Sequence, residues 1–284
     1  MAARALAALA TALAVSGFAF SQGGDPIRVA RTMHSAPLST ASAPTNTAAP
    51  GQAPTCIADG GHCAMQYYGG HVIPNVKVYV VFWEPGTSKV DATVKAGIAD
   101  FYRAATNSEY MDWLTEYRTD IRVQVGSDAG SPGTQQLIGR GTFAGPGQSG
   151  KSISPSNTSV TLDDSIGDIA NELEAQIVAG NLPRPDQHTI YMIYFPAGFT
   201  IINDAQGHAS CTSFCAYHST YQRPSNNQSV FYSVVPDLGP NGCKAGCGRG
   251  TVFANTCSAS SHELIEAVTD AEVGIATVFG PPLA

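Results

Sequence analysis

The stretch VKVYVVFW, Val76–Trp83, decides the fold class because it is a nearly unbroken run of β-branched and aromatic residues. A run of this kind and length predicts a strand that is buried within a sheet. Pro85 and Gly86 follow it and predict the turn that ends the strand. Two later stretches have the same character, HTIYMIYFPAG at 188–198 and SVFYSVVPD at 229–237. We therefore expect three buried strands in one sheet.

Helical patterns alternate with these strands along the chain. The apolar residues of 90–105 and of 163–179 recur at the three- to four-residue spacing of amphipathic helices. Shorter helices are predicted at 108–117 and at 261–270. Because helices and strands alternate, the sequence predicts a single mixed α/β domain with a central sheet flanked by helices.

The N-terminal region predicts export. Arg4, the apolar run that follows it and the small residues before position 22 form the pattern of a secretory signal peptide at 1–21. Residues 22–55 are rich in Ala, Pro, Ser and Thr and are interpreted as a linker or propeptide, so the folded domain starts near Cys56. A secreted protein of the extracellular space or cell wall is therefore expected, with no membrane attachment once the signal is cleaved.

Charge and composition exclude some partners. Charged residues make up 13% of the chain, about half of the roughly 25% usual for soluble domains. Removal of 1–21 takes away Arg4 and no acid, which moves the formal net charge from −7 to −8. This acidic balance argues against nucleic acid and against an anionic membrane surface as partners.

Seven cysteines are present, and four of them form two C-x-x-x-C motifs, Cys211/Cys215 and Cys243/Cys247. In an exported chain these predict disulfide-stapled loops, although a four-cysteine zinc site has similar spacing. The remaining three are Cys56, Cys63 and Cys257. Because the number is odd, one cysteine is free, paired between chains or missing its partner, and we expect an eighth cysteine beyond Ala284, in a chain truncated at its C-terminus.

The stretch SHELIEAVTD, 261–270, predicts a metal site. It begins like the His-Glu-x-x-His helix of metallopeptidases but has Glu266 where the second histidine would stand. Positions four apart lie about 40° from each other around a helix, so His262 and Glu266 are expected on one face. Imidazole nitrogen and carboxylate oxygen both bind zinc. Glu263 is the predicted general base, which would activate a metal-bound water.

A third metal ligand is needed, and the sequence offers three candidates. Asp270 lies one further turn along the helix and can lean toward the same ion. His218 follows the first C-x-x-x-C motif, and His71 in YYGGH is the weakest of the three. Zinc is the expected metal, and carboxylate-rich sites also admit calcium or manganese.

The same helix has an interpretation that needs no metal. Ser260 and Glu263 fit the S-x-x-E capping box of a helix N-terminus. Acidic residues near that end would stabilise the helix dipole. Leu264, Ile265 and Val268 would then be the residues that face the core. An acidic, capped helix is therefore the alternative to a metal site.

The order of motifs resembles the EXORDIUM, or phosphate-induced protein, family of secreted proteins. The matching pieces are YYGGHVIPNVKVYVVFW at 67–83, NSEYMDWLTEY at 107–117, SGKSIS at 149–154, CTSFCAYH at 211–218 and GCKAGC at 242–247. The resemblance implies an extracellular or cell-wall protein and carries over no catalytic residues. Members from plants have small or apolar residues in place of His262 and Glu263, so the chain resembles a microbial branch.

Together these observations predict a secreted metal-dependent hydrolase, a zinc metallopeptidase-like protein that acts on a peptide or cell-wall substrate. His262 and Glu266 would bind the metal with Asp270 or His218, and Glu263 would be the catalytic base. The competing hypotheses are a non-catalytic extracellular protein of the EXORDIUM type and a structural calcium-binding domain.

Overall fold

The computed structural model describes residues 66–124, 128–145, 149–240 and 242–273, and the backbone of short strands at 28–29, 34–37, 58–59 and 62–63. It is a mixed α/β fold whose main sheet has the strand order β1-β11-β12-β9-β5-β6, with β2 paired to β11 and β7 paired to β5. The predicted fold class is confirmed. The predicted signal peptide and the residues after 273 lie outside the described part of the chain.

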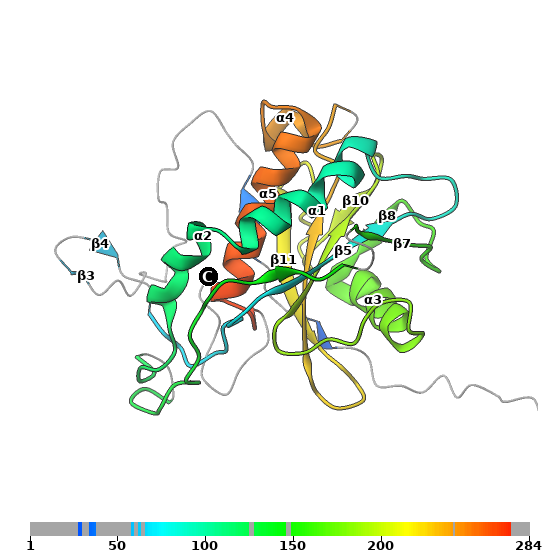
Figure 1. Cartoon of the computed structure of the whole chain (residues 1–284). Coiled ribbons are helices and arrows are strands. Elements are labelled where there is room, and N and C mark those ends of the chain that lie inside the picture. The colour runs from blue at the N-terminus through cyan, green and yellow to red at the C-terminus, as the bar shows by residue number, and fades with distance from the viewer. Residues whose placement is uncertain are drawn as a thin grey trace, which may run out of the picture.

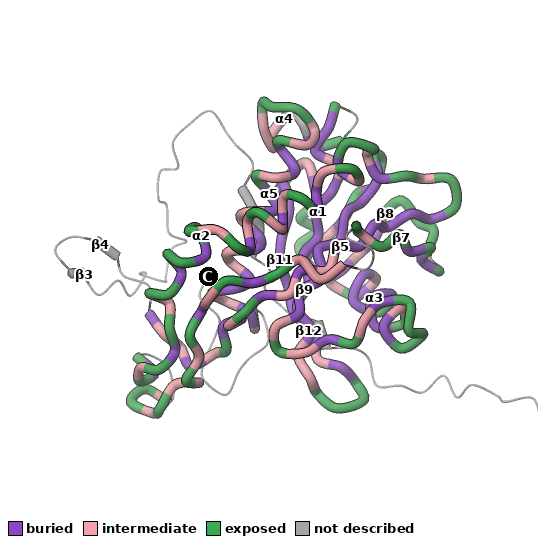
Figure 2. Tube along the Cα trace, in the orientation of Figure 1, coloured by how far each residue is buried: buried purple, intermediate pink, exposed green. Residues whose placement is uncertain are grey.

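The three predicted buried strands form the centre of this sheet. They are β5 (Lys77–Trp83), β9 (Thr189–Tyr194) and β12 (Ser229–Val235), and each is parallel to its neighbour. Every residue of β9 is buried. Side chains of a strand point alternately to the two faces, so β5 places Val80 and Phe82 in one hydrophobic cluster and Val81 in another. Figure 2 shows this sheet as the buried interior of the molecule.

Helices cover both faces of the sheet. α1 (Ala92–Thr106) and α5 (Val252–Thr269) pack together on one face, and α3 (Asp168–Val178) lies on the other (Figure 1). α1 begins two residues after the predicted start at 90, because Asp91 is its N-cap and accepts hydrogen bonds from the backbone N–H of Thr93 and Val94. The expected helix at 108–117 consists of α2 (Glu109–Asp112) and a 3₁₀ turn.

Shorter elements complete the edges. The 3₁₀ turns are η1 (Trp113–Tyr117) and η3 (Asp164–Ile166). The short strands are β6 (Thr142–Phe143), β7 (Lys151–Ile153), β8 (Thr161–Asp163) and β10 (Thr200–Ile202). β6 and β7 extend the parallel sheet beside β5, and β8 pairs with β10 in a separate two-stranded sheet.

One long strand of the sheet, β11 (Phe214–Gln222), runs antiparallel to β12 and was not predicted from the sequence. Two disulfides tie its start to the segment around α4 (Lys244–Cys247). They join Cys211 to Cys243 and Cys215 to Cys247. The two C-x-x-x-C motifs are therefore cross-linked to each other, which confirms the disulfide prediction over the zinc alternative. Among the described cysteines Cys257 is free.

A buried carboxylate, that of Asp164 in η3, lies against the face of β11 that is turned toward α3. Its Oδ2 accepts hydrogen bonds from the hydroxyls of Tyr217 at 2.8 Å and Tyr232 at 2.7 Å. Its Oδ1 accepts from the backbone N–H of Ile169 and Ala170, in the first turn of α3. Four donors from three elements therefore surround this carboxylate, which anchors η3 and α3 to the sheet.

Parts of the predicted linker also form strands. β1 (Arg28–Val29) and β2 (His34–Pro37) pair antiparallel with β11, at the edge of the main sheet. Further along, β3 (Ala58–Asp59) pairs with β4 (His62–Cys63). The segment at 22–55 thus contributes backbone pairing to the domain, where the composition predicted no strand.

None of the described helices is both long enough and apolar enough to cross a bilayer.

Candidate metal centre

Helix α5 carries both glutamates of the candidate site. The residues that it buries recur along one side of the helix: Asn255, Thr256, Ala259, Ser260, Glu263, Leu264, Ala267 and Val268. Glu263 belongs to this buried stripe and is 0% exposed, whereas Glu266, three residues on, keeps 31% of its side chain exposed. Residues three apart are neighbours on a helix surface, so the two carboxylates lie side by side at the border between the core and solvent.

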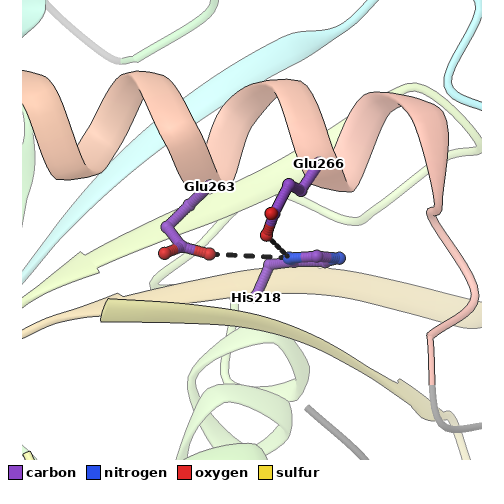
Figure 3. A group of neighbouring side chains, drawn as sticks. All are labelled: His218, Glu263 and Glu266. Carbon is purple, nitrogen blue, oxygen red and sulfur yellow. Dashed lines mark ion pairs between the residues drawn. The ribbon is translucent and has the colours of Figure 1, made fainter. Parts of the chain in front are cut away.

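Strand β11 supplies the third residue, His218, which is 1% exposed. Its side chain lies beneath α5, between the sheet and the helix, and faces both glutamates (Figure 3). The distance from Nδ1 of His218 to Oε2 of Glu263 is 3.5 Å, and the distance to Oε2 of Glu266 is also 3.5 Å. One imidazole nitrogen is therefore shared between two carboxylates that come from the same helix.

These separations suit ligands of one metal ion. One ligand atom from each of His218, Glu263 and Glu266 lies within 4.8 Å of the other two. Two ligands that are each about 2.1 Å from a zinc ion and at the tetrahedral angle lie about 3.4 Å apart. The observed 3.5 Å is close to that value, and it is longer than the roughly 2.8 Å of a charge-assisted N–H···O⁻ hydrogen bond. The buried His/Glu/Glu group could hold a metal ion.

The backbone at the end of α5 orients the imidazole. Nε2 of His218 lies 3.3 Å from the carbonyl oxygen of Asp270, the C-cap residue of the helix. A carbonyl only accepts hydrogen bonds, so Nε2 carries the proton in this contact. In the neutral imidazole this leaves the lone pair on Nδ1, the nitrogen that faces Glu263 and Glu266. Metal-binding histidines are commonly oriented in this way, by a backbone carbonyl on the far nitrogen.

Electrostatics in the site are dominated by the two acids and the imidazole. Burial by itself would lower the pKa of His218, but Glu263 and Glu266 outweigh it and raise this pKa to about 9. Burial raises the pKa of Glu263, and His218 opposes this shift. Burial by itself would raise the pKa of Glu266, but His218 and His262 lower this pKa to about 2. A cation that binds Nδ1 must therefore displace a firmly held proton.

The residues predicted from the sequence are arranged differently from the expected ligand set. His262 and Glu266 do share a face, with Nε2 of His262 at 2.9 Å from Oε1 of Glu266. His262 is 38% exposed and contacts the outer oxygen of Glu266, whereas Oε2 of Glu266 faces His218. Asp270 contributes its backbone carbonyl to His218. His71, the weakest of the three candidates for the third ligand, bonds Glu272 through Nδ1 at 2.9 Å.

Glu263 is the residue whose place the sequence did not predict. It was expected as a base outside the ligand set, and its carboxylate lies within the ligand-competent group. The i,i+3 spacing of Glu263 and Glu266 could have indicated two carboxylates on one side of the helix. The burial of Glu263 could not be predicted from that spacing, because burial depends on which side of α5 packs against the sheet.

The capping-box interpretation of this region is wrong. α5 begins at Val252, and its N-cap is Thr251, whose side chain accepts a hydrogen bond from the backbone N–H of Ala254. Ser260 therefore lies inside the helix, where its hydroxyl is 2.7 Å from the hydroxyl of Tyr194. Glu263 is far from the helix N-terminus and lies on the face buried against the sheet.

Neither a protein-family model nor a curated protein or solved structure matches the chain. The resemblance to the EXORDIUM family stays a prediction. The case for function therefore rests on the residues of the site.

Proposed function

We propose that the chain is a secreted metal-dependent hydrolase in which His218, Glu263 and Glu266 bind a zinc ion. The observation that carries the proposal is the group of three ligand atoms within 4.8 Å, with the far nitrogen of His218 directed at the carbonyl of Asp270. Two adjacent carboxylates, one of them fully buried, favour a cation beside them, because their like charges repel each other. Zinc is favoured over calcium since calcium takes oxygen ligands and one ligand here is an imidazole.

A hydrolytic role agrees with the number and accessibility of the ligands. Three protein ligands leave a coordination position for water, which is the arrangement of catalytic rather than structural zinc sites. A bound zinc lowers the pKa of such a water and polarises a carbonyl group. Glu266 keeps 31% of its side chain exposed, so water could reach a metal held by this group. The likeness of His-Glu-x-x-Glu to the metallopeptidase helix favours the peptide bond as substrate.

His262 is assigned a role in proton transfer. Its imidazole contacts Oε1 of Glu266 and is 38% exposed, so it lies between the buried ligands and solvent. Hydrogen bonding to Glu266 is the main cause that raises its pKa above the ordinary value. A histidine that contacts a ligand and reaches solvent is suited to relay protons between the site and bulk water.

Metal analysis of the purified full-length protein tests the metal site. We expect about one zinc per chain in the native protein and its loss from the Glu266→Gln variant, because the amide is a poor zinc ligand. Glu272→Gln is the matched control, since Glu272 is also a carboxylate bonded to a histidine but lies outside the group. Absence of zinc from protein prepared in zinc-containing buffer would reject the proposal and leave an ion-pair cluster.

Hydrolysis of a mixed peptide library tests catalysis separately. Cleavage should disappear with a zinc chelator and return when zinc is added back. Glu263→Gln separates the two roles considered for that residue. If Glu263 is a metal ligand, the variant should lose metal and cleavage together. If Glu263 is the base, the variant should lose cleavage and keep the metal. Metal binding without any cleavage would retain the site and reject the hydrolase.

A further inference from the structure

Strand β11 is the edge of the sheet formed by the body of the domain. On one side it pairs with β12. Among the described residues its partners on the other side are β1 and β2, which both come from the N-terminal segment before the folded domain. An edge strand presents a row of backbone N–H and C=O groups that can pair with another extended chain. The N-terminal segment therefore occupies an edge that the rest of the domain leaves open.

The segment follows β11 past the candidate metal site. Arg28 and Val29 stand opposite Gln222 and Tyr221, and β2 continues the antiparallel pairing from His218 to Phe214. In this register His34 is the residue opposite His218. β2 also lies against α5, the helix that carries Glu263 and Glu266. The occupied edge thus adjoins both elements that build the metal site.

We propose that the edge of β11 is the binding site for an extended peptide substrate, and that β1 and β2 fill it as a tethered stand-in. Main-chain hydrogen bonds provide the affinity when a peptide adds a strand to a sheet. β2 has the sequence HSAP, and its small residues Ser35 and Ala36 suit such an occupant, because pairing through the backbone makes little demand on side chains. A peptide bound antiparallel to β11 places the residue opposite His218 nearest the metal. The identity of the occupant as substrate rests on the proposed function.

Cleavage of the tether tests the inference. A site-specific protease sequence is inserted between Thr45 and Asn46 in the full chain, and the uncut protein is the matched control. After cutting and dilution, backbone amides of Phe214–Gln222 should exchange at least about tenfold faster, because their outer partners can leave. Addition of a synthetic peptide with the sequence of residues 28–37 should restore protection, and a scrambled peptide should restore less. A peptide that the uncut protein cleaves slowly should be cleaved faster after the cut.

A second variant covers the case in which the cut protein unfolds. Adjacent residues of a strand direct their N–H groups to opposite sides, so one proline of the pair Ser35→Pro and Ala36→Pro removes a donor that faces β11. This double variant, left uncut, should also raise exchange in β11. Unchanged exchange in both proteins overturns the inference, as does a cut protein that keeps its fold and fails to rebind the peptide.

Zinc binding to the cut protein is measured in the same samples, so that the two proposals fail separately. If peptide binding is lost and zinc is retained, the proposal that the edge of β11 binds peptide is overturned, and the metal site is left intact. Peptide binding without zinc retains the edge as a surface for extended chains and rejects peptide as a substrate.

Discussion

Two buried acidic sites lie on opposite faces of the same strand, and their carboxylates are stabilised in different ways. Tyr217 points from β11 toward Asp164, whose carboxylate is surrounded by four neutral donors. His218, the next residue, points to the other face, toward Glu263 and Glu266. Around Asp164 the donors complete a structural anchor. Around His218 two acids share one imidazole, an arrangement that a divalent cation would complete.

The largest expected difference between the two sites is in metal affinity. His218→Gln should weaken zinc binding at least about 100-fold, the upper end of what even outer-sphere partners contribute. Tyr217→Phe is the matched control on the same strand and should change affinity by less than about twofold, since it acts on the opposite face. Competition with a chelating dye measures both. Equal losses in the two variants would show that the faces are coupled.

The next largest effect is on stability at the other site. Asp164→Ala leaves two tyrosine hydroxyls and two backbone N–H groups without their acceptor. We expect it to lower the free energy of unfolding by about 3 kcal/mol, because buried donors without partners are costly. Urea denaturation of the metal-free protein measures this loss. Zinc affinity of the folded variant should stay within about twofold of the native value, and a large change would contradict the separation of the two faces.

A smaller effect is expected from pH on the metal-free protein. The pKa of His218 is raised from its ordinary value of 6.5 to about 9. The protonated imidazole therefore stabilises the fold fully below pH 6.5, and this contribution is lost as the pH rises through about 9. Urea midpoints measured across that window should decline, and the decline should be smaller in His218→Gln. Zinc affinity should rise over the same window, because the metal competes with the proton. A variant with the native slope would exclude His218 as the titrating group.

The smallest effect concerns the helix that holds both glutamates. Thr251→Ala removes the side chain that accepts from the N–H of Ala254 at the start of α5. We expect a loss of about 1 kcal/mol in unfolding free energy, the usual value for an N-cap. Zinc affinity should fall by less than about threefold, since the glutamates lie beyond the first turns. A larger loss of affinity, measured with the same dye, would mean that the helix must be intact from its first residue to position them.

Local residue type predicted the elements that are most apolar. β5, β9 and β12 consist mainly of β-branched and aromatic residues, and such strands belong in a sheet buried on both faces. β11 has the sequence FCAYHSTYQ and is buried along most of its length. Its polar residues Ser219, Thr220 and Gln222 interrupt the apolar pattern that would predict a buried strand. The strand is buried because helices cover both of its faces, and that is a property of the assembled fold.

The start of α5 was missed for a related reason. Its first turns, around VFANTCSAS, contain small and polar residues without a strong apolar stripe. These residues form helix because Thr251 caps them and because Asn255 bonds the carbonyl of Leu238. A capping pattern further along, at Ser260, matches the S-x-x-E rule, but Ser260 lies inside the helix with its hydroxyl 2.7 Å from that of Tyr194.

The sequence by itself determined that an imidazole and carboxylates would gather on one helix, because helical spacing alone brings His262 to within 2.9 Å of Glu266. Only the tertiary structure decided that Glu263 turns inward, that His262 stays at the solvent side, and that His218 completes the group. The physical reason is that spacing fixes angles within a helix, whereas packing against the sheet selects the face that is buried and the strand that lies beneath it.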